Sequence, residues 1–93
     1  MDTKIEHKIV QCGNLAENHP GRLVVGTKQI RKALKNDESS TVFLAENADP
    51  AITESLEAMC REQKVPVSWV RSMKDLGAAC GIQVGAAAAA IRN

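Results

Sequence analysis

Short apolar runs alternate along this chain with segments that have helical spacing and helix end signals, and this alternation restricts the folds the sequence can adopt. Strands that alternate with helices indicate the α/β class, with helices on both faces of one sheet. The alanine-rich run favours helix by propensity, but its place after a helix and a loop favours a buried strand. The predicted strands are Leu23–Val25, Thr41–Leu44, Val65–Val70 and Ala86–Ile91.

Helix signals occupy the intervals between these runs. Near-helical apolar spacing predicts a first helix from about Thr3 to Glu17, which His19-Pro20-Gly21 would end. Side chains that can accept hydrogen bonds from free N–H groups precede three more segments. We expect Thr27 to cap a helix over about Lys28–Lys35, Asp49 and Pro50 to start one that runs to about Gln63, and Ser72 to cap a short one that ends at Gly81.

The 93 residues fit a single domain, 1–93, whose core must be aliphatic because Phe43 and Trp69 are the only aromatic residues. We expect Trp69 to lie in this core. So few aromatic rings argue against RNA binding by rows of base-stacking side chains.

The net charge is only +1, but its distribution is uneven. Residues 1–35 hold seven Lys/Arg and three Asp/Glu, whereas residues 36–93 hold five and eight. This asymmetry indicates either a basic patch that faces an anionic partner or charges scattered over a solvated surface.

Patterns for catalysis, cofactors and metals are absent from the sequence, so we expect a protein that is not an enzyme. The histidines His7 and His19 have no recognisable nucleophile or acidic partner. Metal-ligand and nucleotide-binding spacings are missing as well. The cysteines lack CxxC spacing and are expected to be passive, reduced thiols in the cytoplasm; they are Cys12, Cys60 and Cys80. The longest apolar run, Ala86–Ile91, is too short to cross a membrane.

One predicted helix carries an unusual concentration of positive charge. Lys28, Arg31, Lys32 and Lys35 have the i, i+3, i+4, i+7 spacing that places them on one helical face. Like charges at this spacing repel, and no carboxylate within the helix relieves them. The face is either a solvated surface or a site for an anion.

The turn that begins this helix, Gly26-Thr27-Lys28-Gln29, favours the second interpretation. It presents backbone N–H groups at a helix N-terminus, which can hold a phosphate. Gln29 adds an amide that can donate and accept hydrogen bonds. A basic face beside one amide is suited to gripping a nucleic-acid backbone and contacting a base.

Two segments resemble the signatures of a known family. Residues Gly26–Ala33 are similar to the signature helix of the kink-turn-binding ribosomal proteins, and residues Val70–Gly81 are similar to that family's second signature. The second segment leads into the loop Ile82–Ala87, which corresponds to the family's specificity loop. The resemblance covers about residues 23–91, and the two motifs occur in the family's order, which makes it more specific than either motif alone.

The resemblance implies a three-layer α/β/α sandwich around a small mixed four-stranded sheet. It also implies binding to the kink-turn, a sharply bent RNA motif with tandem sheared G·A pairs. The partner would be a structured RNA, ribosomal or of another kind, and we expect a monomer without a cofactor. The RNA-binding residues implied are Gly26, Thr27, Lys28, Gln29, Arg31, Lys32, Asp49, Ile82, Gln83, Val84 and Gly85.

The chain departs from the family pattern Gly-Thr-Asn-Glu-x-x-Lys at two positions. Lys28 replaces the asparagine and Gln29 replaces the glutamate, as in small bacterial stand-alone members of the family. Gln29 keeps an acceptor oxygen for a guanine N–H, and Lys28 can meet a phosphate or a guanine edge.

Other residues have simpler alternative roles. Asp49 lies where the family has an acidic residue near a flipped-out nucleotide, but it can equally cap a helix. Ile82 and Val84 would contact this nucleotide or pack on their own domain.

Two other functions share the implied fold. The first is the substrate-recognition domain of some RNA methyltransferases, but 93 residues leave no room for a catalytic domain. The second is a protein scaffold that docks partners through the alanine-rich C-terminal segment.

Overall fold

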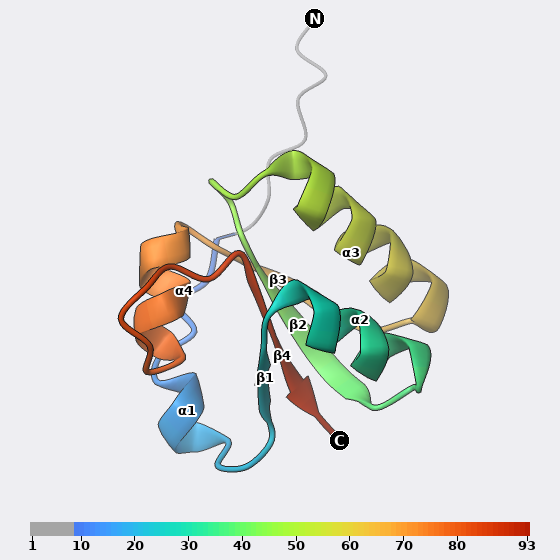
Figure 1. The fold of residues 1–93 in the computed structure, drawn as a ribbon, viewed down its shortest axis with the longest axis horizontal. Coiled ribbons are helices and arrows are strands. Elements are labelled where there is room, and N and C mark those ends of the chain that lie inside the picture. The colour runs from blue at the N-terminus through green and yellow to red at the C-terminus, as the bar shows by residue number, and fades with distance from the viewer. Residues whose placement is uncertain (1–8) are drawn as a thin grey trace, which may run out of the picture.

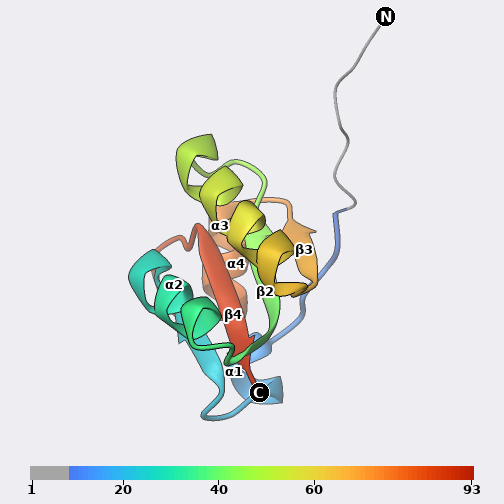
Figure 2. The same ribbon diagram turned by 90° about the vertical axis from the view of Figure 1, so that its right-hand side faces the viewer.

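In the computed structural model, which describes residues 9–93, a four-stranded mixed sheet lies between two layers of helices (Figures 1 and 2). The strand order is β1-β4-β2-β3. The α/β/α sandwich expected from the resemblance is therefore confirmed. The elements are α1 (Leu15–Asn18), β1 (Leu23–Val25), α2 (Thr27–Lys35), β2 (Ser39–Ala45), α3 (Pro50–Gln63), β3 (Val67–Val70), α4 (Met73–Ala79) and β4 (Ala88–Arg92).

The two central strands are the most apolar. β4 pairs antiparallel with both β1 and β2, and β2 pairs in parallel with β3 through the crossover helix α3. The alanine-rich run is confirmed as a strand from Ala88 onward, with the side chains of Ala88–Ile91 all buried, whereas Ala86 and Ala87 precede the strand. Alanine suits this position because its small side chain lets helices pack closely on both faces of the strand.

Each face of the sheet has its own apolar core. Ile30 and Leu34 of α2 and Leu56 of α3 pack on one face, with Trp69 8% exposed at its edge. Leu15 of α1 and Leu76 of α4 belong to the cluster on the other face. The core is aliphatic, as the scarcity of aromatic residues predicts.

The helix N-caps predicted from the sequence are present in the structure, with one exception. Asp49 Oδ1 accepts a hydrogen bond from the Ala51 N–H at 2.9 Å, and Ser72 Oγ accepts one from the Asp75 N–H at 3.1 Å. Thr27, however, does not cap α2: it is the first helical residue, and the N-cap is Gly26, whose φ of 106° turns the chain into the helix.

Strand bounds also differ from those predicted. β2 extends beyond the predicted Thr41–Leu44 at both ends, from Ser39 to Ala45. β3 begins at Val67, after Pro66, because proline has no N–H for the sheet.

The predicted N-terminal helix is wrong over residues 9–14 and confirmed only at its end, where α1 begins at Leu15. Thr3–Lys8 lies outside the described residues, and only Leu15–Asn18 is helical in the remainder. Ile9 instead forms a parallel bridge with Trp69, and the Val10 N–H donates to the Trp69 carbonyl at 2.8 Å. The segment therefore covers the outer edge of β3, a tertiary contact that local spacing does not reveal.

Candidate nucleic-acid interface

The predicted site residues lie in helix α2 and in turns and loops that adjoin one end of the sheet. β1, β2 and β3 end there and β4 begins there, because Val25 pairs with Ala89, Leu44 with Ala88, and Ala45 with Val70. The start of α2, the turn before α3 and the loop before β4 therefore adjoin this end (Figure 1). The three predicted segments, 26–32, 49 and 82–85, are brought to one side of the molecule.

The N-terminus of α2 differs from those of the other helices in the described part of the chain. Side chains of Asn14, Asp49 and Ser72 cap α1, α3 and α4, but no side chain caps α2. A helix leaves its first N–H groups without intrahelical acceptors. Those of α2 thus remain available to an anion, in a region made positive by the helix dipole.

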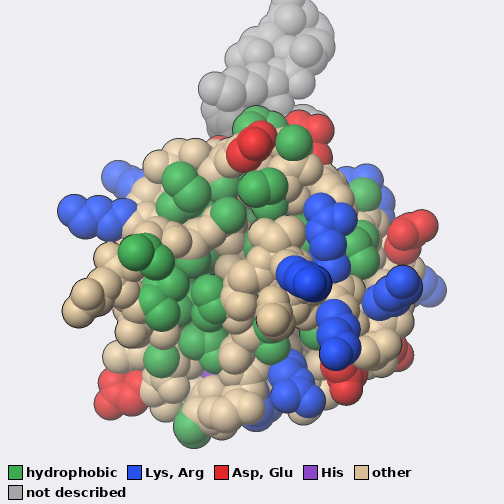
Figure 3. Space-filling model, viewed as in Figure 1, with side chains coloured by type: hydrophobic (Ala, Val, Ile, Leu, Met, Phe, Trp, Pro, Cys, Tyr) green, Lys and Arg blue, Asp and Glu red, His purple; other side chains and the backbone are tan. Residues whose placement is uncertain are grey.

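The basic face predicted for α2 is present. Lys28, Arg31, Lys32 and Lys35 are exposed, while Ile30, Ala33 and Leu34 are buried against the sheet. Within residues 9–93, no ion pair engages any of the four cations. Figure 3 shows Lys and Arg side chains gathered over α2. The positive charge is therefore unneutralised and directed to solvent.

Gln29 lies beside this face, and its side chain is exposed. Its Oε1 is 3.6 Å from the point where a Cβ on Gly26 would lie, so the amide is folded toward the turn. A Cβ at this distance would make only ordinary contact with the amide, so it is the positive φ of Gly26 that favours glycine here.

The apolar loop after α4 is divided between core and surface. Ile82 is half-buried and packs against the core cluster that contains Leu76, whereas Val84 is 71% exposed. Gln83 and Gly85 are also exposed. Figure 3 shows hydrophobic side chains gathered over this region, to the left of the basic group. Val84 is thus the apolar side chain that the loop presents outward.

Close contact with α4 fixes the path of this loop. A Cβ on Gly77 would overlap the Val84 carbonyl oxygen, so only glycine permits the observed approach. The Ala86 N–H donates to the Met73 carbonyl at 2.9 Å, and the Met73 N–H donates to Asn47 Oδ1 at 2.8 Å. Asn47 and Gly77 therefore position the loop. Neither residue was predicted to have this role, although a glycine within a helix is a signal that could have found Gly77.

Asp49 lies at the same end of the sheet, exposed, with one carboxylate oxygen engaged in capping α3. Capping of α3 is confirmed, and the second oxygen of the carboxylate takes no part in this bond. The two roles considered for Asp49 are compatible.

The cysteine thiols have surroundings that keep them protonated. Burial is the main cause that raises the pKa of Cys60 and of Cys80 to about 11, with smaller contributions from Glu57 and Cys12 respectively. Burial also raises the pKa of Cys12, with a smaller contribution from Asp75, and a backbone hydrogen bond lowers it in part. A thiol is nucleophilic as the thiolate, so these groups are poorly suited to attack a substrate.

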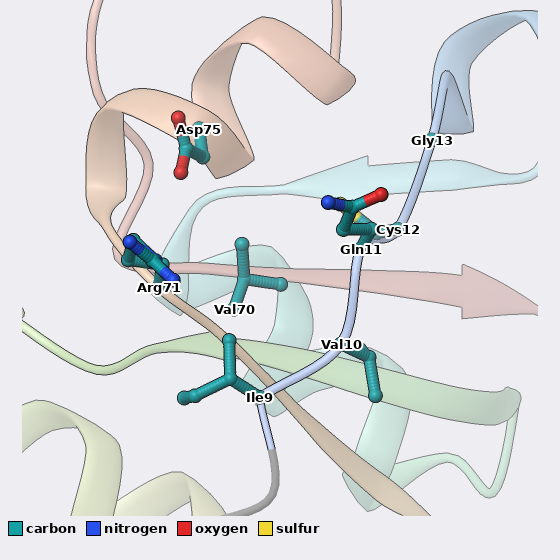
Figure 4. Close-up of a pocket in the computed structure, with 8 residues that line it drawn as sticks. All are labelled: Ile9, Val10, Gln11, Cys12, Gly13, Val70, Arg71 and Asp75. Atoms are coloured by element: carbon teal, nitrogen blue, oxygen red, sulfur yellow. The ribbon is translucent and has the colours of Figure 1, made fainter.

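Cys12 lines a cavity of about 610 Å³ between the N-terminal segment and β3 (Figure 4). Arg71 and Asp75 lie across this cavity from Gln11 and Cys12. None of the residues predicted to bind RNA contributes to it. No helix in the described chain is long and apolar enough to span a membrane.

Comparisons with known proteins identify relatives over most of the chain. The model of the ribosomal protein L7Ae/L30e/S12e/Gadd45 family matches residues 10–93. "RNA-binding protein YbxF" of Geobacillus stearothermophilus is 55% identical over 71 residues, which are 76% of this chain and 87% of that protein. "RNA-binding protein TTE2299" of Caldanaerobacter subterraneus is 38% identical over 76 residues, 82% of this chain and 93% of that protein.

Solved structures agree with this result. The "Giardia lamblia 15.5kD RNA binding protein" superposes with a TM-score of 0.79 at 26% identity, covering 86% of this chain and 69% of that one. A Bacillus halodurans protein of unknown function superposes with a TM-score of 0.76 at 25% identity, covering 86% of this chain and 79% of that one.

Proposed function

Because the chain belongs to the ribosomal protein L7Ae/L30e/S12e/Gadd45 family, we propose that it is a non-enzymatic RNA-binding protein that recognises kink-turns in structured RNA. Relatives named as RNA-binding proteins support the general part of this proposal. The observation that carries it is the uncapped, cationic start of α2 at the same end of the sheet as the exposed loop around Val84.

The arrangement is suited to a bent RNA because it offers two chemistries side by side. The free N–H groups and cations of α2 can hold phosphates, and Gln29 and Lys32 can contact base edges. Val84 offers an uncharged contact to an unstacked nucleotide, which a straight duplex does not present. Asp49 and Gln83 are exposed and can add hydrogen bonds to this nucleotide. The protein would act as a monomer in the cytoplasm, on ribosomal or other structured RNA.

A scaffold that docks partners through its alanine-rich segment is less consistent with the structure. Ala88, Ala89 and Ala90 are buried in a central strand between β1 and β2, so their side chains offer no docking surface.

The test is a comparison of affinity for one model kink-turn RNA and for a straight duplex of the same length and composition. We expect at least about tenfold tighter binding to the kink-turn at physiological salt, which corresponds to about 1.4 kcal/mol. Equal affinity for both RNAs would refute shape recognition and leave a non-specific basic surface. No binding to either would refute RNA binding.

A further inference from the structure

The groove between α2 and α3 is a cationic surface beyond the start of α2. It has a volume of about 440 Å³ and is lined by Arg31, Lys32, Lys35 and Met59, with no carboxylate among these residues. Figures 1 and 2 both show α2 and α3 side by side on one face of the sheet. Three exposed cations thus converge on a depression whose remaining lining residue is uncharged.

The surfaces that flank this groove have a different charge. On the other side of α2, a smaller groove is lined in part by Glu38 and Arg92, whose carboxylate and guanidinium lie 4.0 Å apart. Beyond α3, the cavity next to β3 is lined by Glu46, Glu54 and Glu57, against a single cation, Arg61. Of these three depressions, only the α2–α3 groove is lined by several cations and no carboxylate.

We infer that this groove holds the phosphodiester backbone of an RNA helix that flanks the bend, so that the RNA extends over α3 and away from Arg92. The inference rests on the proposed kink-turn recognition at the start of α2. Lys32 lines the grooves on both sides of α2 and joins the base-contacting end of the helix to the α2–α3 groove.

The dimensions of this groove fit a short length of backbone. Arg31 and Lys35, the first and last cations that line the groove, are about 6 Å apart along the helix axis. One strand of a DNA duplex carries a phosphate roughly every 3.4 Å of axis, and on this scale the cations of the groove span about two phosphates. The apolar side chain of Met59 can contact the intervening ribose.

The experiment compares three RNAs that contain the same kink-turn. In the first, both flanking helices are trimmed to about three base pairs; in the others, one or the other helix is extended to about ten. We expect extension of one helix only to tighten binding of the unaltered protein. Arg31→Ala and Lys35→Ala should each reduce this gain about fivefold at roughly 0.15 M salt, the effect of one lost phosphate contact. Arg92→Ala removes a cation from the flanking groove and should leave the gain unchanged.

A gain-of-charge variant tests the groove without removing any contact. Met59→Lys places a fourth cation there, and its flexible side chain can keep the apolar packing of its stem. It should steepen the salt dependence of binding to the favoured extended RNA by about one unit of log affinity per log salt. Ala58→Lys is the matched control, because it adds the same charge to an exposed neighbouring position of α3 that does not line the groove.

The outcomes distinguish a failure of the groove from a failure of RNA recognition. If neither extension tightens binding, or if Arg92→Ala acts as strongly as Arg31→Ala, the groove does not hold the backbone and the inference is refuted. The same conclusion follows if Ala58→Lys and Met59→Lys have equal effects. If all three RNAs bind no better than a straight duplex, the proposed function itself is refuted, and the inference with it.

Discussion

Lys32 is the cation of α2 that lines both neighbouring grooves, and it is one of the two residues proposed to contact base edges. Lys32→Met removes the charge and keeps the apolar stem. We expect a loss of about 1–3 kcal/mol in the free energy of binding to a kink-turn RNA, the usual range for a base contact. Lys64→Met, at the far end of α3, is the control and should bind normally. Equal losses in titrations of the two variants would contradict a base contact by Lys32.

Substitutions at two residues of the loop after α4 test RNA binding and folding stability separately. Val84→Ala shortens a side chain that is 71% exposed, so affinity should fall while the free energy of unfolding stays within about 0.5 kcal/mol. Ile82→Ala removes packing against the core and should reduce stability by about 1–2 kcal/mol at this half-buried site. Neither change should alter the salt dependence of affinity, because neither removes a charge. Urea unfolding and titrations at several salt concentrations check both variants. A Val84→Ala protein with unchanged affinity would show that the loop does not contact RNA.

The buried thiols predict a loss of stability in alkali. The pKa of Cys60 and of Cys80 is about 11 in the folded chain, against 9.0 for an unperturbed thiol, so the unfolded state loses these protons first. The protonated thiols contribute fully to the free energy of unfolding below about pH 9. This contribution is lost as the pH rises toward 11, and the loss is at most about 2–3 kcal/mol for each thiol. Urea unfolding at about pH 8, 9.5 and 10.5 should show the decline. The free energy of unfolding of the double variant, Cys60→Ala with Cys80→Ala, should decline less over this pH range. An equal decline would show that other groups cause the effect.

At the scale of elements, α4 and the loop that follows it act as one unit. Gly77→Ala would place a Cβ against the Val84 carbonyl oxygen, so the loop must move. We expect lower stability and at least about tenfold weaker RNA binding in the variant, which is about 1.4 kcal/mol. Ala78→Gly changes the neighbouring, exposed residue of the same helix and should reduce stability by about 1 kcal/mol while leaving affinity unchanged. Gly77→Ala with normal affinity would show that the loop position does not matter for binding.

The elements that could be predicted from the sequence are those whose signals are local. β1, α3 and α4 follow from a short apolar run, an Asp-Pro start and a Ser cap within a few residues of each element. The N-terminal segment depends on a distant contact instead. It pairs with Trp69, far along the chain, so its apolar spacing predicted a helix that most of its described residues do not form.

The candidate site could be predicted in part for the same reason. The basic face of α2 follows from helical spacing alone, and the structure places its four cations on the exposed side. The roles of Asn47 and Gly77 could not be predicted, because each depends on a contact between segments that only the folded chain brings together.

At the scale of the whole molecule, the net charge is only +1, but positive and negative side chains are unevenly distributed. Three of the four cations of α2 line a different groove from the cavity that is bordered by Glu46, Glu54 and Glu57. If about three phosphates meet α2, affinity for a kink-turn RNA should fall about fortyfold between roughly 50 and 200 mM salt. Titrations over this range check the value, and affinity that does not change with salt would contradict backbone contacts by α2.

The central position of β4 in the sheet affects when the chain can fold during synthesis. β1 pairs with no strand but β4 among the described residues, and Leu23 meets Ile91 only after the intervening sequence has been made. Contacts between such distant residues slow folding, because a long loop must close before they form. Until residues 88–92 emerge, α2 has its charges but no complete sheet beneath it, and the loop around Val84 has no strand to anchor its end. A nascent chain is therefore expected to gain its binding surface in a single late step, together with its fold.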